Sequence, residues 1–121
     1  IEDIDLLENV IRSNKIEIIY HLAAKNINIS STLSPFSTLE ANIRGSYNLL
    51  EAVRLQDKQM PGVILASSQE VEKYDVEKAN FRKKRHPYEV SKTCAELIAN
   101  AYADIFGLKI SERAFILGRP I

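Results

Sequence analysis

Three side chains near the middle of the sequence could together move a proton to or from an alcohol. Tyr88 and Lys92 are four residues apart, so on a helix they lie one turn apart on the same face. A free tyrosine titrates at about 10, too high for a base at neutral pH, but a nearby ammonium favours the phenolate. Ser68 follows an apolar run, Val63–Ala66, that is typical of a buried strand, and its hydroxyl could hold the substrate oxygen. This pattern predicts oxidation of an alcohol: Tyr88 takes the hydroxyl proton while a hydride leaves the same carbon for a nicotinamide ring.

A tyrosine and a lysine at this spacing also occur on the surfaces of many unrelated helices, so a pair without catalytic function is the alternative interpretation. The surrounding pattern alternates between helices and strands. In chain order it predicts a short helix around residues 6–11, capped by Asp3 or Asp5, and then a buried strand at 16–22. A long helix follows, starting in a Ser37–Glu40 capping box, and then a strand at 63–67. The last two elements are a helix from Pro87 to Gly107 and an interrupted strand at 109–117. Strands separated by helices imply parallel pairing with right-handed crossovers. The predicted fold class is therefore α/β, a partial Rossmann-like parallel sheet of about three strands.

The spacing of apolar residues also predicts which faces of the two long helices are buried. The first helix should turn a stripe of Leu39, Ile43, Tyr47, Leu50 and Val53 towards the core. The second should do so with Val90, Cys94, Leu97, Ile98, Ala101 and Ile105.

Four motifs with a fixed order and spacing carry a resemblance to a known family. They are Tyr20–Ala24 (YHLAA), Glu40–Ala52 (EANIRGSYNLLEA), Ala66–Ser68 (ASS) and Pro87–Lys92 (PYEVSK). From about residue 16 to residue 113, the chain resembles the extended short-chain dehydrogenases/reductases, in their nucleotide-sugar epimerase/dehydratase branch. The sequences of residues 40–51 and 86–99 are most similar to the CDP-glucose 4,6-dehydratase-like members. The resemblance implies NAD, or else NADP, as cofactor, a nucleotide-diphosphate sugar as substrate, and a reaction through a 4-keto sugar intermediate.

The resemblance also implies roles for individual residues. Ser68, Tyr88 and Lys92 match the family's catalytic serine, tyrosine and lysine. Glu70 resembles the base of other sugar dehydratases and decarboxylases. The implied cofactor-binding residues are Leu22, Ala23, Ala24, Asn42, Ser67, Tyr88 and Lys92.

The sequence departs from the family pattern in three places. Gln69 stands where the dehydratases have an aspartate that helps to expel the sugar's 6-hydroxyl. Glu72 and Lys73 alter the expected V-Y-G, and Ile116 replaces the asparagine of an R-x-x-N motif that begins at Arg113. Two functions therefore remain open. The chain is either part of a dehydratase or epimerase, or a truncated or degenerate homologue that serves as a non-catalytic assembly module.

The four glycines, Gly45, Gly62, Gly107 and Gly118, are too far apart to form the glycine-rich turn that binds a dinucleotide pyrophosphate. Residues 1–121 are therefore expected to be a single partial NAD(P)-binding domain without the N-terminal glycine-rich βαβ unit and the C-terminal substrate region. We expect the isolated chain to bind NAD weakly or not at all and to be inactive. An open sheet edge should favour a homo-oligomer.

Composition excludes several other classes of protein. The sequence is 45% apolar and 26% charged with no net charge, which argues against binding to nucleic acid or membranes. A single cysteine, Cys94, rules out an internal disulfide and suits the cytoplasm, and it is expected to pack rather than react. No spacing of ligands predicts a metal site, and His21 is expected to be a hydrogen-bonded core histidine. The basic run Arg82–Arg85 is expected to be a solvated loop.

Overall fold

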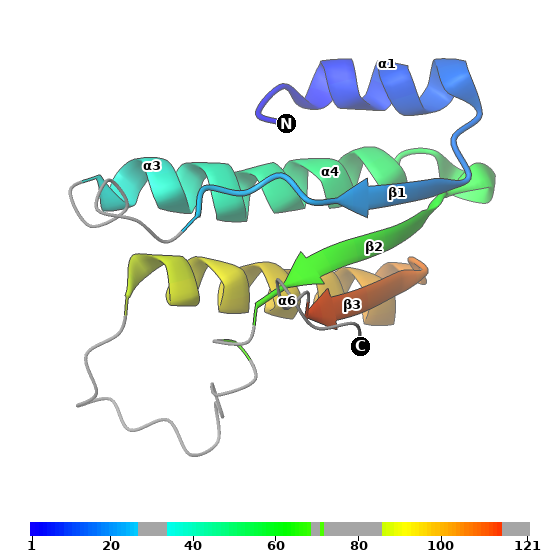
Figure 1. The fold of residues 1–121 in the computed structure, drawn as a ribbon. Coiled ribbons are helices and arrows are strands. Elements are labelled where there is room, and N and C mark those ends of the chain that lie inside the picture. Colours follow the sequence, from blue (N-terminus) through cyan, green and yellow to red (C-terminus); the bar gives the residue numbers. More distant parts are fainter. Residues whose placement is uncertain (27–33, 69–70, 72–85, 115–121) are drawn as a thin grey trace.

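The computed structural model describes residues 1–26, 34–68, 71 and 86–114, and for residues 113 and 114 it describes the backbone alone. The elements are, in order, α1 (Ile4–Asn14), β1 (Ile18–His21), α3 (Pro35–Leu39), the π-helical turn η1 (Glu40–Arg44), α4 (Gly45–Arg54), the 3₁₀ turn η2 (Asp57–Gln59), β2 (Gly62–Ser67), α6 (Pro87–Phe106) and β3 (Ile110–Ala114). Figure 1 shows α3, η1 and α4 as one continuous helix.

The three strands form a parallel sheet in the order β1-β2-β3. Ile19 pairs with Val63 in the first ladder, and Leu65 pairs with Glu112 in the second. The sheet confirms the predicted parallel α/β arrangement. The predicted third strand is confirmed as far as residue 114, and its expected continuation to residue 117 lies outside the described residues.

One face of the sheet packs against α4 and α6, which lie behind the strands in Figure 1, whereas α1 lies above them. The buried apolar residues of this core come from every layer: Ile11, Leu49, Leu50, Ala52, Val53, Val63, Leu65, Ala99 and Leu108. The other face of β1 is exposed. Ile18 is 55% exposed and Tyr20 is 63% exposed, because only alternate residues of this strand point towards the helices. The predicted strand at 16–22 is therefore confirmed at residues 18–21, but its predicted burial is wrong for one of its two faces.

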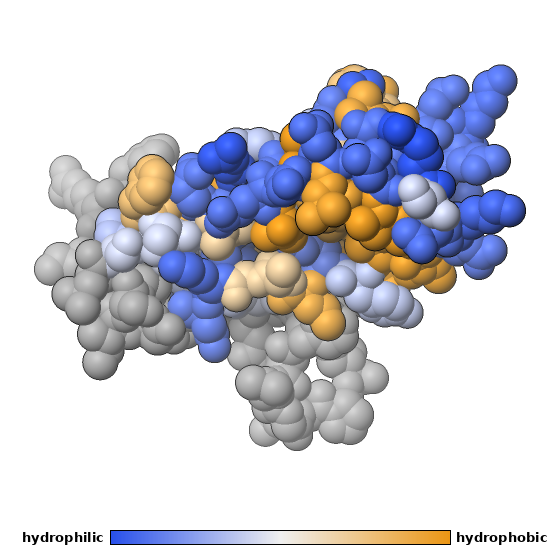
Figure 2. Space-filling view, turned by 90° about the horizontal axis from the view of Figure 1, so that it is seen from above, coloured by the Kyte–Doolittle hydropathy of each residue, from blue (hydrophilic) through white to orange (hydrophobic). Residues whose placement is uncertain are grey.

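Helix α1 was predicted correctly, with Asp3 as its N-cap. The Oδ1 atom of Asp3 accepts a hydrogen bond of 2.9 Å from the backbone nitrogen of Leu6. Ile11 is buried beneath the helix, whereas Leu6 and Val10 are exposed. Figure 2, which views the molecule from above α1, shows such apolar surface between hydrophilic residues.

The long helix begins earlier than predicted and turns a different face to the core. Its first residue is Pro35, Ser34 is the N-cap, and the Ser37 hydroxyl donates to the Ser34 carbonyl instead of capping a helix. Leu50 and Val53 are buried as predicted, but Tyr47 is 40% exposed. Tyr47, Leu50 and Val53 all follow the π-helical turn, so the turn does not account for this difference. The buried residues of α4 are Gly45, Ser46, Asn48, Leu49, Leu50, Ala52 and Val53.

Helix α6 starts at Pro87 and stops at its C-cap Gly107 as predicted. Its predicted apolar stripe is correct at Ile98, which packs against the core, but wrong at two other positions. Leu97 is 54% exposed and Ile105 is 75% exposed. The buried residues are small or polar: Ser91, Lys92, Thr93, Ala95 and Ala99. Small side chains let the α6 backbone approach the other helices closely, so the larger apolar side chains are left facing outwards.

His21 is a hydrogen-bonded core histidine, as predicted. Its Nε2 atom lies 2.9 Å from the Ser46 hydroxyl, which itself donates to the Asn42 carbonyl at 2.6 Å. The hydroxyl proton is used in that second bond, so His21 must be the donor in the first. Burial, helped by the charge of Lys92, lowers the pKa of His21 to about 4.

This lowered pKa predicts a loss of stability in acid. In the unfolded chain His21 takes up a proton at about pH 6.5, whereas in the folded chain it stays neutral down to about pH 4. The free energy of unfolding therefore falls as the pH drops from about 6.5 to about 4. Between pH 7.5 and pH 5 the loss is about 2 kcal/mol. Urea unfolding at both pH values measures it. The variant His21→Gln keeps a donor but cannot titrate, so it should lose less stability in acid; an identical loss would contradict the prediction.

Candidate active site at the carboxyl edge of the sheet

The three predicted catalytic residues that the structure describes, Ser68, Tyr88 and Lys92, lie at one edge of the molecule. Because the strands are parallel, the carboxyl ends of β1 and β2 lie at the same edge, and Figure 1 shows the first turn of α6 on that side. Ligands of open α/β sheets bind at this edge.

The first turn of α6 places Tyr88. Pro87 occupies the first helical position, where its missing N–H costs nothing. His86 is the N-cap, and its Nδ1 atom accepts a hydrogen bond of 3.2 Å from the Tyr88 backbone nitrogen. The Glu89 carboxylate accepts in return from the His86 backbone nitrogen at 3.5 Å. Tyr88 is half-buried in this capped turn.

Lys92 extends from the next turn of α6 to the end of β2. It is 7% exposed, and its Nζ atom donates to the Ala66 carbonyl. Burial lowers the pKa of Lys92, and the carboxylate of Glu96 acts in the opposite direction. The structure thus brings Lys92 to the strand end that carries Ser67 and Ser68, as the sequence predicted.

The two serines at this strand end differ in their surroundings. Ser67 is the last residue of β2, and its hydroxyl donates to the Oε1 atom of Glu96. Ser68 follows directly and is half-buried. Gln69, Glu70 and Ile116 lie outside the described residues.

Asn42 connects the end of β1 to helix α6. Its Oδ1 atom accepts from the Lys25 backbone nitrogen at 2.6 Å, and its Nδ2 atom donates to the Lys25 carbonyl at 3.0 Å. The same Nδ2 atom donates to the Ser91 hydroxyl at 2.9 Å, and that hydroxyl donates to the Tyr88 carbonyl at 2.7 Å. Asn42 is 2% exposed, and both of its amide hydrogens are used within the protein. Its position supports a bracing role, and its direct contact with a cofactor stays a prediction.

The π-helical turn lies where Asn42 makes these contacts. The Gly45 backbone nitrogen donates to the Glu40 carbonyl five residues earlier, which is the bond that defines such a turn. A Cβ atom on Gly45 would lie 3.1 Å from the side chain of Ile1, so close packing accounts for this glycine. Single π-helical turns are frequent at functional sites.

The segment after β1 is open to solvent and has small side chains. Leu22 is 63% exposed, Ala23 and Ala24 are exposed, and the next residue is the Lys25 held by Asn42. Two alanines allow another molecule to approach this backbone closely. Together with the Lys92 ammonium, they are a suitable set of groups for the nicotinamide half of a dinucleotide, which carries ribose hydroxyls and a flat ring.

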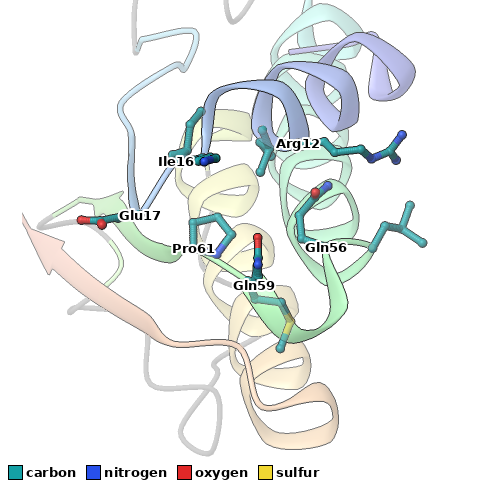
Figure 3. Close-up of a pocket in the computed structure, with 10 residues that line it drawn as sticks. Arg12, Ile16, Glu17, Gln56, Gln59 and Pro61 are labelled. Carbon is teal, nitrogen blue, oxygen red and sulfur yellow. The ribbon is translucent and has the colours of Figure 1, made fainter.

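A cavity of about 710 Å³ lies at the opposite edge and contains none of the predicted site residues. Figure 3 shows residues of α1, η2 and the segments before β1 and β2 around it, among them Arg12, Ile16, Glu17, Gln56, Gln59 and Pro61. This is the amino edge of the sheet, away from the candidate site.

The described residues contain neither a metal-binding cluster nor a membrane-spanning helix. No cluster of three or more histidine, cysteine, aspartate or glutamate side chains in the described ranges could hold a metal ion. None of the helices in the described part of the chain is both long and apolar enough to span a membrane.

Sequence reasoning missed several groups that build this edge. Ser91 lies one helical turn after Tyr88, and Glu96 lies one turn after Lys92. This spacing could have indicated both residues from the sequence, because residues three or four apart on a helix are neighbours. The backbone of Lys25 had no such signal, because its contact with Asn42 depends on the path of the chain between β1 and α3.

The Asn42–Ser91 hydrogen bond makes a prediction about stability. Asn42→Ala should cost about 2–3 kcal/mol in the free energy of unfolding, because it removes a buried amide that makes three hydrogen bonds, two to the Lys25 backbone and one to Ser91. Ser91→Ala should cost about 1–2 kcal/mol, and the double variant should cost less than the sum. Urea unfolding of the three proteins measures this. Ser37→Ala is the control. It removes an exposed hydroxyl that accepts a hydrogen bond from the Lys25 ammonium at 2.9 Å, and it should lower the free energy of unfolding by under about 0.5 kcal/mol. Additive losses would contradict the coupling.

Comparison with known proteins identifies related chains. Residues 1–116 match the family described as GDP-mannose 4,6 dehydratase. The chain is 32% identical over 113 residues to the CDP-glucose 4,6-dehydratase of Salmonella typhimurium, covering 88% of this chain and 31% of that protein.

Solved structures with the same fold include two bound to NAD. UDP-glucose 4-epimerase from Thermus thermophilus superposes with a TM-score of 0.75 and 26% identity, covering 92% of this chain and 37% of that one. DesIV, a dTDP-glucose 4,6-dehydratase from Streptomyces venezuelae, superposes with a TM-score of 0.75 and 25% identity, covering 92% and 34%.

The chain therefore spans about a third of the length of these relatives. The family match confirms the nucleotide-sugar epimerase/dehydratase branch predicted from the four motifs, and the superpositions confirm the Rossmann-like sheet. On the match over residues 1–116, the chain belongs to the GDP-mannose 4,6-dehydratase family.

Proposed function

We propose that residues 1–121 form the catalytic part of an NAD-dependent nucleotide-sugar 4,6-dehydratase or epimerase. The observation that carries this proposal is the buried ammonium of Lys92 at the end of β2, on the α6 face that also carries Tyr88 and beside the two serines. The names of the relatives support the substrate class, because they act on CDP-, UDP- and dTDP-glucose.

In this mechanism Tyr88, as the phenolate, removes the proton from the 4-hydroxyl of the sugar. The Lys92 ammonium favours that phenolate by electrostatic attraction, and Ser68 holds the reacting oxygen by a hydrogen bond. NAD, when bound, supplies the hydride acceptor. The 4-keto group then acidifies the neighbouring C5 hydrogen, which Glu70 can remove in a dehydratase. An epimerase needs only to turn the keto sugar over before it is reduced again.

The cofactor would lie against the carboxyl edge. We infer that Leu22, Ala23 and Ala24 contact the cofactor and that Ser67 and Lys92 bind the nicotinamide ribose. Asn42 would support this edge by holding the segment after β1 against α6. Residues 1–121 contain no glycine-rich turn, so we infer that they are a partial domain that binds NAD or NADP weakly without further chain.

Exposed apolar surface leads us to propose that the chain self-associates. Ile18 and Tyr20 on β1 and Leu97 and Ile105 on α6 are each more than half exposed. Apolar groups and an open strand edge of this kind favour association. Light scattering should give a mass of at least twice the 13.7 kDa of one chain. A monomeric mass at high concentration would contradict this proposal.

Substitution of Tyr88 tests the mechanism in the longest natural protein that contains these residues. Tyr88→Phe should lower turnover of the nucleotide sugar by ~10²–10⁴, because no 4-keto intermediate forms. Tyr47→Phe, on the exposed side of α4, is the matched control and should leave turnover unchanged. Near-normal turnover in Tyr88→Phe would overturn the mechanism and favour the non-catalytic assembly module.

Substitution of Glu70 separates the two reactions. Glu70→Gln should still reduce NAD, which the NADH absorbance detects, while a dehydratase loses C5 proton removal and product. An epimerase does not need this base and should retain its full turnover.

A further inference from the structure

Two hydrogen bonds join neighbouring residues of α6 to neighbouring residues of β2. Lys92 donates from Nζ to the Ala66 carbonyl, and Glu96 accepts at Oε1 from the Ser67 hydroxyl. Lys92 and Glu96 are four residues apart, so they lie one turn apart on the same face of the helix. The carboxyl end of β2 is therefore attached to α6 at two successive residues, through one cationic and one anionic side chain.

We infer that Glu96 is a positioning residue for the proposed Tyr88–Lys92 pair: through Ser67 it fixes the end of β2 on α6, and its carboxylate is the countercharge that keeps Lys92 an ammonium. The inference rests on the proposed function, in which the Lys92 charge acts on Tyr88.

The surroundings of Lys92 show why a countercharge is needed. Lys92 is 7% exposed, and removal of an ammonium from water favours its neutral form. Within the described part of the chain, two titratable groups interact electrostatically with Lys92: His21 from β1 and Glu96 from α6. His21 is neutral. Glu112 lies on the neighbouring strand β3, paired with Leu65, and burial raises its pKa, which favours its protonated form. Among the described residues, Glu96 is the group whose charge raises the pKa of Lys92.

The Ser67 hydroxyl explains how the Glu96 carboxylate stays in place. A glutamate on an exposed helix loses side-chain freedom when it is held near a lysine, and such pairs contribute little. Here the Ser67 hydroxyl at the strand end holds the carboxylate, and Glu96 is half-buried. The same bond orients the segment that continues into Ser68.

Titration of Lys92 by NMR in this chain tests the charge directly, without any need for turnover. Lysine labelled with ¹³C at Cε reports each ammonium, and Lys92→Met identifies the signal of Lys92. Glu96→Gln keeps an oxygen that can accept from Ser67 but removes the charge, so the titration midpoint of Lys92 should fall below that of the wild type. Asp104→Asn removes a charge from the same helix about 18 Å further along, beyond the screening length, and should leave the midpoint unchanged.

Equal Lys92 midpoints in the wild type and Glu96→Gln would overturn the inference. Should Glu96→Gln fail to fold, Glu96→Asp carries the same test. Its shorter carboxylate keeps the charge further from Lys92, so the midpoint should again fall below the wild-type value, and an unchanged midpoint would overturn the inference.

A pH profile of turnover in the longest natural protein containing these residues tests the consequence for catalysis. In Glu96→Gln the alkaline limb of kcat should move to lower pH, because one pH unit above the new midpoint the ammonium fraction has fallen about tenfold. Ser67→Ala loses a hydrogen bond but keeps the carboxylate, so it should lower kcat without moving this limb as far. Equal displacement in both variants would leave Glu96 with a structural role only. The two proposals fail separately: an inactive wild type overturns the proposed function, whereas the Lys92 titration tests the inference without any need for turnover.

Discussion

The side chain of Asn42 is the contact on which the carboxyl edge depends. One buried amide satisfies the backbone nitrogen and carbonyl of Lys25 and the hydroxyl of Ser91, so it joins the end of β1 to α6. A buried amide without partners costs free energy, and the partners that Asn42 needs fix where the chain after β1 passes. The π-helical turn belongs to the same constraint, because its extra residue sets the direction of Asn42 relative to the rest of α4. Since Ser91 also bonds the Tyr88 carbonyl, the turn that carries the proposed base is positioned from the other side of the helical layer.

Electrostatics in the interior follow from this packing. Two basic groups, His21 and Lys92, are buried near one another, and their repulsion is resolved by keeping one of them neutral. His21 becomes the neutral partner because its unperturbed pKa is far lower, and burial lowers it to about 4. Lys92 has the Ala66 carbonyl as acceptor and the Glu96 carboxylate as countercharge. The positive charge of this region is therefore concentrated at the end of β2, where the proposed chemistry requires it.

The order of elements was predictable from the sequence, and the faces of the helices were not. Apolar runs located β1, β2 and β3, Pro87 and Gly107 marked the limits of α6, and the four motifs indicated the family. The predicted stripe of α6 failed at two positions because hydrophobic periodicity assumes that large apolar side chains face the core. In this helix small residues such as Ala95 and Ala99 do so. For the long helix, no residue type in the sequence signals the π-helical turn. Lys92 at the strand end was predictable from its spacing to Tyr88, whereas the contact of Asn42 with Lys25 requires the tertiary path.

The four exposed apolar residues that we propose to favour self-association lie on two different surfaces of the molecule, which limits how one partner can cover them. Ile18 and Tyr20 alternate with residues that face the helices, so they belong to the bare face of the sheet. Leu97 and Ile105 belong to the face of α6 that points away from Ala95 and Ala99, on the outer side of the helical layer. A partner that covers the sheet therefore leaves the α6 surface exposed, and one that packs on α6 leaves the sheet bare. Because parallel sheets are normally covered on both faces, full burial requires two separate contacts, one that adds a layer to the sheet and one that packs against α6.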